Sequence, residues 1–356
     1  MRILHVVAGA ATGGAETFSL DAITALAERG IEQKVLCRPH RQTLAKLAEA
    51  SVPYETLAFR PAARLVGGPA AIRRAATGWG ADLVHAWMSR AASFVPAGMP
   101  CPVIGWMGGY YNLKYFTTAD YLIGVTPRIR DHIVEHGVAP QRAFVCHTFG
   151  TMPDAPGVSR ASLGLPQDAL LLLTLSRLHP KKGLDVLIDA FLALVQDAKF
   201  ARWRLVIAGD GPADYTANLK ARAVNNERVI FTGWLDGEEK DAVLSCASLL
   251  ALPSHQENFG LCVIEAFSHS VPVLLSPHVN LAEEIVLANA GWIATVDKEA
   301  LRTRLAEALS DEQELARRGR AGKQLSQKYS WENTAKGLAD LYRSILGNGN
   351  ADVHRV

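Results

Sequence analysis

Residues 248–266 read SLLALPSHQENFGLCVIEA, an apolar run followed by a polar turn and a second apolar segment. The run Ser248–Leu252 predicts a buried strand, and a short helix is expected to begin near Gly260 and to end before Pro272. Short aliphatic runs alternate with longer amphipathic segments in this way through most of the chain. Because this alternation is typical of parallel sheets covered by helices on both faces, we expect an α/β fold.

Two series of such strand and helix units are expected. Strands are predicted near residues 2–8, 33–38, 82–87, 102–107, 121–126 and 143–148, and again near 169–176, 204–210, 229–234, 248–254, 271–275 and 291–295. The polar stretch Gly150–Gly157 contains two prolines and is expected to be the linker. We therefore expect two Rossmann-like, doubly wound domains facing a cleft, at residues 1–155 and 156–328. Residues 329–356 are expected to form a C-terminal helix with one apolar face, and a tail.

The composition excludes several classes of protein. With 49% hydrophobic and 20% charged residues among 356, the chain is not disordered. The net charge of +2 argues against a dedicated nucleic-acid binder, although residues 1–160 hold 16 basic and 11 acidic residues. The five cysteines are scattered without a C-x-x-C pair, which favours a reducing cytoplasm over a disulfide framework or a zinc site. No apolar run reaches the roughly 18 residues of a membrane span, so any membrane contact would be peripheral.

Two turns could hold an anion. Gly9–Glu16 (GAATGGAE) comes after the first predicted strand and opens a helix, where glycines would let backbone amides approach a phosphate. It is not a dinucleotide fingerprint, and a bare strand-to-helix turn is the alternative. The first strand of the second domain ends at Ser176, and Arg177–Gly183 (RLHPKKG) comes next. Arg177 and Lys182 at the mouth of this turn would neutralise a diphosphate, and a solvated basic loop is the alternative.

The segment Ser254–Ala266 carries the strongest chemical signal. Glu257 lies in the turn before the expected helix, and Glu265 lies within it among apolar residues. A carboxylate in such surroundings is costly unless it is hydrogen-bonded, and paired sugar hydroxyls would satisfy it. The amides of Asn258, Phe259, Gly260 and Leu261 would point to a ligand at the helix N-terminus. The alternative is a pair of glutamates that bond within the protein.

Two further features bear on a nucleotide diphosphate. Ala208–Pro212 (AGDGP) ends the next predicted strand, and Gly209 would let a ligand approach the backbone, or simply make a turn. The chain contains no Asp-x-Asp, although closely spaced carboxylates usually hold the divalent ion in enzymes that use one on such substrates. Arg177 and Lys182 would then take the place of a metal, and no cofactor is expected.

Taken together, these motifs resemble the retaining glycosyltransferases of family 4, which have the GT-B fold. The resemblance extends in order from about residue 3 to about residue 342 and is carried by five motifs. They are GGAE (13–16), S-R-L-x(3)-K-G-x-D-x-L-I-x-A (176–190), AGDGP (208–212), FTG (231–233) and E-N-F-G-L-x(3)-E-A (257–266).

The resemblance implies a metal-independent enzyme that binds a nucleotide-sugar in its C-terminal domain and an acceptor in its N-terminal domain, with the last helix crossing back to the first domain. Arg177 and Lys182 would grip the diphosphate, Glu265 would hold the ribose hydroxyls, and Glu257 would contact the donor sugar. The resemblance also implies that the loop with Gly13 and Gly14 closes over the phosphates. The backbone of Trp234 and Leu235 would surround the base.

One position departs from the family pattern. Family members commonly carry a histidine after the fourth strand, near the donor sugar, where this chain reads GWMGGYY (105–111). That role is either absent or taken by a neighbour. His85 stands where the family often has a histidine, and it is expected either to bind the acceptor or to be structural.

The acceptor is expected to meet residues 108–116 (GGYYNLKYF), whose aromatic rings stack on sugars and whose Lys114 would meet an anionic group. Tyr110, Tyr111 and Asn112 complete this set, and rings packed inward are the alternative. The stretch is similar to bacterial transferases that mannosylate the lipopolysaccharide inner core, which implies GDP-mannose as donor and a glycolipid acceptor. Another hexosyl or heptosyl transfer to a surface or lipid-linked glycan, an NDP-sugar epimerase, a phosphorylase and a non-catalytic nucleotide binder remain alternatives.

Arginines near residues 60–74 favour contact with an anionic membrane surface. Arg60, Arg64, Arg73 and Arg74 lie within a largely apolar stretch, and such a segment can lie on an anionic leaflet.

Overall fold

The computed structural model describes residues 1–10, 14–60, 62–63, 67–149, 158–224, 226–235 and 237–347, with the backbone alone for 14–16. Contacts divide the chain into two compact units, Met1–Phe149 with Trp331–Val356 (unit 1) and Gly150–Ser330 (unit 2). The expected linker at Gly150–Gly157, the domain boundary at residue 155, Gly13, Arg64 and the tail beyond Gly347 lie outside the described residues.

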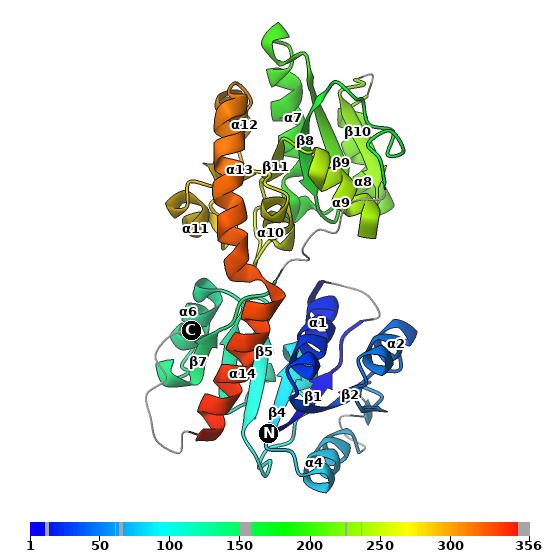
Figure 1. Cartoon of the computed structure of the whole chain (residues 1–356), viewed down its shortest axis with the longest axis vertical. Helices are drawn as coiled ribbons and strands as arrows, with labels where there is room; N and C mark the ends of the chain where they lie inside the picture. The colour runs from blue at the N-terminus through cyan, green and yellow to red at the C-terminus, as the bar shows by residue number, and fades with distance from the viewer. Residues whose placement is uncertain are drawn as a thin grey trace. The chain divides into compact units, whose positions relative to one another are not determined.

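Unit 1 is built on a parallel sheet with the strand order β3-β2-β1-β4-β5-β6-β7. Its strands are β1 (Arg2–Val7), β2 (Glu32–Cys37), β3 (Tyr54–Thr56), β4 (Leu83–Trp87), β5 (Val103–Met107), β6 (Tyr121–Gly124) and β7 (Ala143–Val145). Its helices are α1 (Gly14–Glu28), α2 (Arg41–Glu49), α4 (Gly68–Trp79), α5 (Met88–Ala92), α6 (Pro127–Glu135), α14 (Trp331–Gly347) and the 3-10 turns η1 (Leu113–Tyr115) and η2 (Pro140–Arg142). The C-terminal helix α14 packs beside α1 (Figure 1).

Unit 2 repeats this plan with a parallel sheet in the order β10-β9-β8-β11-β12-β13. Its strands are β8 (Leu170–Leu175), β9 (Trp203–Ala208), β10 (Val229–Gly233), β11 (Leu249–Leu252), β12 (Val273–Leu275) and β13 (Gly291–Ile293). Its helices are α7 (Leu184–Leu194), α8 (Ala213–Arg222), α9 (Gly237–Cys246), α10 (Leu261–Ser268), α11 (Ala282–Leu287), α12 (Lys298–Ala308) and α13 (Glu312–Ser326), with the 3-10 turns η3 (Pro180–Lys182), η4 (Ala198–Phe200) and η5 (Gln327–Tyr329).

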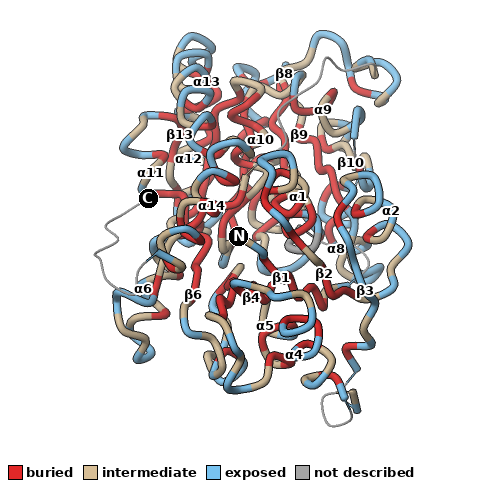
Figure 2. The backbone as a smooth tube through the Cα atoms, turned by 60° about the horizontal axis from the view of Figure 1, so that its bottom comes forward, coloured by how far each residue is buried: buried red, intermediate tan, exposed pale blue. Residues whose placement is uncertain are grey.

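Both sheets reverse their strand order beside the first strand of the unit. In unit 1, β1 has β2 on one side and β4 on the other, and in unit 2, β8 has β9 on one side and β11 on the other. This is the doubly wound arrangement, in which ligands bind outside the carboxyl ends of the strands at the point of reversal. In both units most strands are buried and the helices expose their outer faces, as expected for sheets covered on two sides (Figure 2).

The predicted α/β class is confirmed, and all twelve predicted strands are present within two residues of their expected starts. The strand that sequence reasoning missed is β3 at Tyr54–Thr56, a three-residue edge strand whose residues are all exposed. Such a strand carries neither alternation nor an apolar run, so no periodicity marks it. No helix among the described residues is both long enough and apolar enough to cross a lipid bilayer.

The interior of unit 1 contains a chain of hydrogen bonds that joins β4, β1, β2 and α1. The Trp87 indole Nε1 donates to His5 Nδ1 (3.1 Å), so His5 Nε2 must carry the proton that it shares with Gln33 Oε1 (2.8 Å). Gln33 Nε2 in turn donates to the carbonyl of Ile23 (2.9 Å). Burial lowers the pKa of His5 to about 4, so the imidazole is neutral at pH 7.

His85 of β4 lies opposite His5 and ties the C-terminal helix to this interior. Its side chain is fully buried and stacks on Trp87 with ring centroids 4.2 Å apart. His85 Nδ1 lies 2.5 Å from the hydroxyl of Tyr342 on α14. Burial, together with the smaller effect of the charge of His5, holds the pKa of His85 well below its usual value. The histidine therefore links the sheet of unit 1 to a helix residue that stands 257 positions later in the chain.

Replacing Tyr342 with Phe should destabilise unit 1 by about 1–3 kcal/mol, because it leaves a buried imidazole nitrogen without its partner. Hydrogen exchange of the β4 and β5 amides reports this unit by itself. Tyr54→Phe is the matched control, since that ring is 39% exposed, and it should change the same protection by less than about 0.5 kcal/mol. Equal effects of the two substitutions would show that the buried bond contributes nothing.

Unit 1 should lose stability as the pH falls below about 6.5. The unfolded histidines take up protons near that pH, whereas folded His5 does so only near pH 4, so between these values the unfolded state binds more protons. Each such histidine lowers the free energy of unfolding by up to about 1.4 kcal/mol per pH unit. NMR of the imidazole carbons should show His5 still neutral at pH 5 and His85 titrating well below its usual pH range. Protonation of either ring near pH 6.5 in the folded protein would contradict this account.

Candidate functional site

The candidate site lies in unit 2, at the carboxyl ends of β8 and β11. These strands are neighbours in parallel register, with Leu249 opposite Leu172. Gly183, with φ +63°, ends the turn after β8, and a Cβ on it would lie 2.3 Å from the carbonyl oxygen of Pro253. The His255 amide donates to the Lys181 carbonyl (2.7 Å), so the two loops are held against each other.

Lys182 and Glu257 form an ion pair between these two loops. The Lys182 Nζ bonds Glu257 Oε2, and the two side chains are only 17% and 16% exposed. An ammonium has three N–H donors, so Lys182 keeps two for another acceptor. Because a partly buried charge is costly without a partner, each member of this pair offsets the burial cost of the other and fixes its position. The structure thus brings together two residues that the sequence predicted separately.

The backbone of Glu257 is fixed by the loop after β12. The Glu257 amide donates to His278 O (3.1 Å), its carbonyl accepts from the Asn280 amide (3.2 Å), and it bridges in parallel to Val279. The Asn280 side-chain Nδ2 also donates to the carbonyl of Asn258 (2.9 Å). The glutamate is therefore anchored on both sides of its Cα, which leaves little freedom for its position relative to Lys182.

Glu265 on α10 is paired with Lys240 of α9. Nζ and Oε1 are 2.7 Å apart, and the side chains are 24% and 13% exposed. The sequence predicted Glu265 to be buried but supplied no protein partner for it. Lys240 was missed because it lies 25 residues away on another helix and belongs to no motif. The Glu265 carboxylate thus has a protein partner, as the alternative interpretation required. Its contact with ribose hydroxyls stays a prediction.

Cys262 lies within the same cluster of charges. Burial, and then the nearby carboxylates of Glu257 and Glu265, raise the pKa of its thiol to about 12, while Lys182 acts in the opposite direction. The thiol is therefore neutral at pH 7, and the charges that matter in this cluster belong to the two ion pairs.

Cations without carboxylate partners lie on the turn after β8. Arg177 is exposed, and Lys181 Nζ bonds the neutral Oε1 of Gln256 (2.9 Å). Neither has an ion-pair partner among the described residues. Because Lys182 and Lys240 are balanced by Glu257 and Glu265, this edge of the sheet retains positive charge suited to an anionic ligand.

Buried polar atoms without partners also gather at the end of β11. Ser254 Oγ and Asn258 Oδ1 are buried and have no hydrogen-bond partner among the described residues. Such orphaned atoms are rare in native interiors and are satisfied by water or by a ligand. The expected helix begins at Leu261, with Gly260 in the left-handed conformation (φ +87°) before it.

Gly209 has a structural reason to be glycine. Its φ is +149°, and a Cβ there would lie 1.8 Å from the carbonyl oxygen of Ser176. The Leu178 amide donates to Asp210 O (2.8 Å), so the turns after β8 and β9 are packed against each other. This contact positions the neighbouring Arg177, and a direct contact of Gly209 with a ligand stays a prediction.

The remaining predicted donor contacts differ in exposure. Trp234 is 61% exposed, and Leu235 beside it is buried. Phe259 is buried with its ring edge against Tyr329, at a centroid distance of 5.6 Å, which makes it a packing residue. Gly14 is the first residue of α1.

In unit 1, the predicted acceptor residues differ in their exposure. His85 is fully buried, so its position fits the structural alternative rather than an acceptor contact. Asn112 Oδ1 accepts from the Lys114 amide (2.9 Å) as the cap of η1, and the Lys114 Nζ lies 5.1 Å from the ring of Tyr115. The exposed Tyr110 ring stands edge-on to His132, at 5.3 Å. Tyr111 is only partly exposed, and its hydroxyl lies 3.7 Å from Met88 Sδ.

Among the described residues, no group of three or more His, Cys, Asp or Glu side chains is arranged to hold a metal ion. All five cysteines are free thiols.

Comparison with known proteins agrees with this architecture. The family model "Glycosyl transferases group 1" matches residues 158–325, and "Glycosyltransferase Family 4" matches residues 12–149. The chain is 30% identical to D-inositol 3-phosphate glycosyltransferase of Streptomyces avermitilis, over 76% of this chain but only 62% of that relative's length. It is 28% identical to the lipopolysaccharide core biosynthesis glycosyltransferase LpsD of Rhizobium meliloti, over 85% of this chain and 83% of LpsD.

A solved structure shows the same fold. Anabaena HepE, crystallised in complex with UDP, superposes with a TM-score of 0.80 over 97% of this chain and 100% of HepE, at 20% identity. The fold is that of a GT-B protein. The two family models, which together match residues 12–149 and 158–325, show that this chain is a glycosyltransferase of the family 4 type.

Proposed function

We propose that this protein transfers a hexose from a nucleotide-sugar to a glycolipid acceptor in lipopolysaccharide core assembly. The observation that carries the proposal is the Lys182–Glu257 pair beside Arg177, at the reversal point of the unit 2 sheet. The acceptor class is supported by the match to LpsD, which covers most of both chains.

In this proposal, Arg177 and Lys182 neutralise the leaving diphosphate. Arg177 is free to bind phosphate oxygens with its planar fork, and Lys182 offers the two N–H donors that Glu257 does not use. Stabilising the charge that develops on the departing diphosphate is then the main catalytic contribution. Glu257 keeps Lys182 in position and reaches the hydroxyls of the donor sugar.

We further propose that transfer proceeds with retention, by attack of the acceptor on the face that the diphosphate leaves. Retaining glycosidases instead place a carboxylate about 5 Å from the acid to attack the sugar. Here both carboxylates of the site are held by lysines, Glu257 by Lys182 and Glu265 by Lys240. Arg177 and Lys182 would perform the work of a divalent ion, so the proposed reaction needs no metal.

Two nucleotide-sugars are candidates for the donor. The likeness of residues 108–116 to lipopolysaccharide mannosyltransferases favours GDP-mannose, whereas the complex of HepE with UDP favours a UDP-sugar.

The proposed setting is the cytoplasmic side of an anionic membrane. Peripheral contact with that membrane is supported by the exposed Arg60 and Arg74. Ile72 is buried in unit 1 and so does not face a membrane. Arg73 is already engaged, because its guanidinium donates to the carbonyls of Ala97 and Gly98.

Lys182→Ala should lower kcat at least tenfold, or about 1.4 kcal/mol in the barrier, because the leaving group loses its ammonium. Lys199→Ala is the matched control, since this exposed lysine lies in η4, just before β9 and so at the opposite edge of the same sheet, and it should stay within about twofold. Steady-state kinetics with hydrogen exchange of the β8 amides separates lost catalysis from lost folding. An unchanged kcat in a folded Lys182→Ala protein would remove Lys182 from this role.

A thermal-shift panel of UDP, GDP, ADP and CMP should show one selective nucleotide. A ligand that binds only the native state adds about 2.7 kcal/mol at 100 times its Kd. Selective stabilisation by GDP supports GDP-mannose as donor, and selective stabilisation by UDP overturns it in favour of a UDP-sugar. No shift with any nucleotide would contradict donor binding altogether.

Transfer should continue in excess EDTA, because the charge on the diphosphate is met by side chains rather than by a divalent ion. A rate within about twofold of the untreated enzyme is expected. Loss of activity that Mg²⁺ or Mn²⁺ restores would contradict the metal-independent mechanism.

A further inference from the structure

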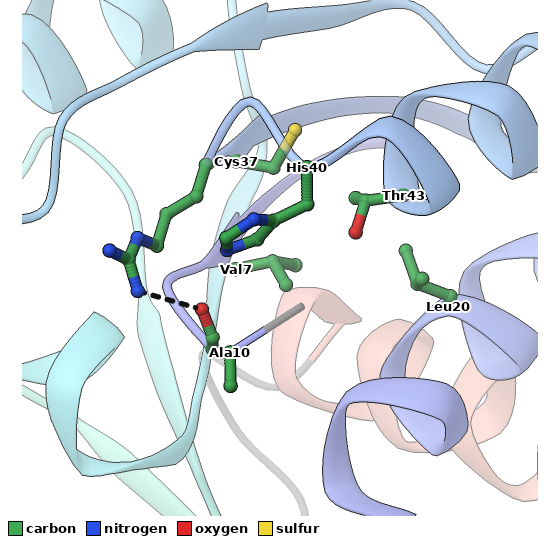
Figure 3. A pocket seen from close by; sticks show the side chains of 8 residues that line it. Val7, Ala10, Leu20, Cys37, His40 and Thr43 are labelled. Carbon is green, nitrogen blue, oxygen red and sulfur yellow. Dashed lines mark hydrogen bonds between the residues drawn. The ribbon is translucent and has the colours of Figure 1, made fainter. Parts of the chain in front are cut away.

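Unit 1 contains a small pocket that the proposed donor site does not involve. It lies where the carboxyl ends of β1 and β2 meet the start of α2 (Figure 3). The residues that line it are Val7, Gly9, Ala10, Leu20, Cys37, Arg38, His40 and Thr43. Gly9 and Ala10 belong to the turn after β1 that the sequence marked as able to hold an anion. The residues from β2 and α2 were not singled out by sequence, because no motif joins the end of β2 to that turn.

Three polar side chains line this pocket. The Arg38 guanidinium donates to the carbonyl of Gly9 through one N–H (3.2 Å), which leaves its other donors available. The His40 Nε2 is buried and has no hydrogen-bond partner among the described residues. Thr43 is only 6% exposed, and no bond of its hydroxyl to another described residue is present. The pocket is therefore rich in unused hydrogen-bond donors.

The start of α2 adds backbone donors beside these side chains. The helix spans nine residues, Arg41–Glu49, and its first backbone acceptor bond runs from the Leu44 amide to His40 O (3.0 Å). The amides before Leu44 therefore have no partner within the helix. The His40 side chain does not cap the helix, and the first turn contains no acidic residue. A helix N-terminus in this state favours an anion.

The rest of the pocket does not compete for such an anion. Its floor is apolar, with Val7, Leu20 and Cys37 all buried, and no acidic residue lines it. Burial raises the pKa of the Cys37 thiol to about 11, so this group is neutral at pH 7. Asp21 on the neighbouring α1 is engaged by Lys46 of α2.

We propose that this pocket binds an oxyanion, a phosphate or a carboxylate, carried by the acceptor. Arg38, the Thr43 hydroxyl and the free amides of α2 donate to its oxygens, and the unpartnered His40 Nε2 is a further hydrogen-bonding group beside them. The assignment to the acceptor rests on the proposed function, because the acceptor is the second substrate of a transferase. The oxyanion site itself rests only on the geometry of unit 1.

Amide NMR of the full chain, titrated separately with inorganic phosphate and with acetate, tests the site directly. Either anion should shift the amides of residues 41–44, and the one that acts at lower concentration identifies the chemistry. Arg38→Gln and Thr43→Val should each weaken this binding at least fivefold. Arg41→Gln is the control, because it removes one charge from the same turn at an exposed position outside the pocket, and it should stay within about twofold.

No shift at residues 41–44 with either anion would overturn the proposal, as would equal weakening by Arg38→Gln and Arg41→Gln. This titration needs no turnover, so it stands or falls independently of the transferase assignment.

A kinetic experiment then tests the acceptor assignment. Arg38→Gln should raise KM for a sugar-acid or sugar-phosphate acceptor at least tenfold, with kcat within about threefold, and should leave KM for the uncharged ester unchanged. If anion binding is found but Arg38→Gln raises KM equally for the charged acceptor and its ester, the site is real and its assignment to the acceptor is wrong.

Discussion

The parallel pairing of β8 with β11 is the constraint on which the proposed donor site depends. Parallel strands place their carboxyl ends at one edge, and the reversal of strand order makes the loops after β8 and β11 neighbours although 75 residues separate Lys182 from Glu257. Gly183 allows the close contact between these loops, and the Lys181 carbonyl accepts from the second loop. Without this strand pairing, nothing else in the described structure would bring Lys182 and Glu257 into contact.

Charge pairing then sets what this edge can bind. Two partly buried lysines are each matched by a glutamate, so each pair is neutral and fixed in position. Positive charge in excess of these pairs remains on the exposed part of the turn after β8, at Arg177. A bound diphosphate would contact the Lys182 ammonium, which Glu257 already holds in place, and the exposed Arg177 guanidinium could move toward it. Holding such groups in advance reduces the reorganisation that the reaction requires.

Sequence patterns predicted the strands and the residues of the loops far better than the partners of those residues. Apolar runs and motifs are local, so Lys182 and Glu257 could be found, whereas the Lys240–Glu265 pair joins two helices and leaves no periodic signal. His85 illustrates the same limit, because its burial is completed by Tyr342 of α14, a contact that no local pattern contains. The exposed β3 was missed because a three-residue edge strand has no core-facing pattern.

The central claim is that the donor diphosphate binds at the carboxyl ends of β8 and β11. Hydrogen exchange measured with and without saturating GDP or UDP tests this claim most directly. The account predicts slower exchange in the segments 176–184 and 254–266 with the nucleotide that binds. Protection near Gly209 and Trp234 would report the predicted contacts with the rest of the nucleotide. Nucleotide binding that leaves both segments unchanged, or that protects only other parts of unit 2, would contradict it.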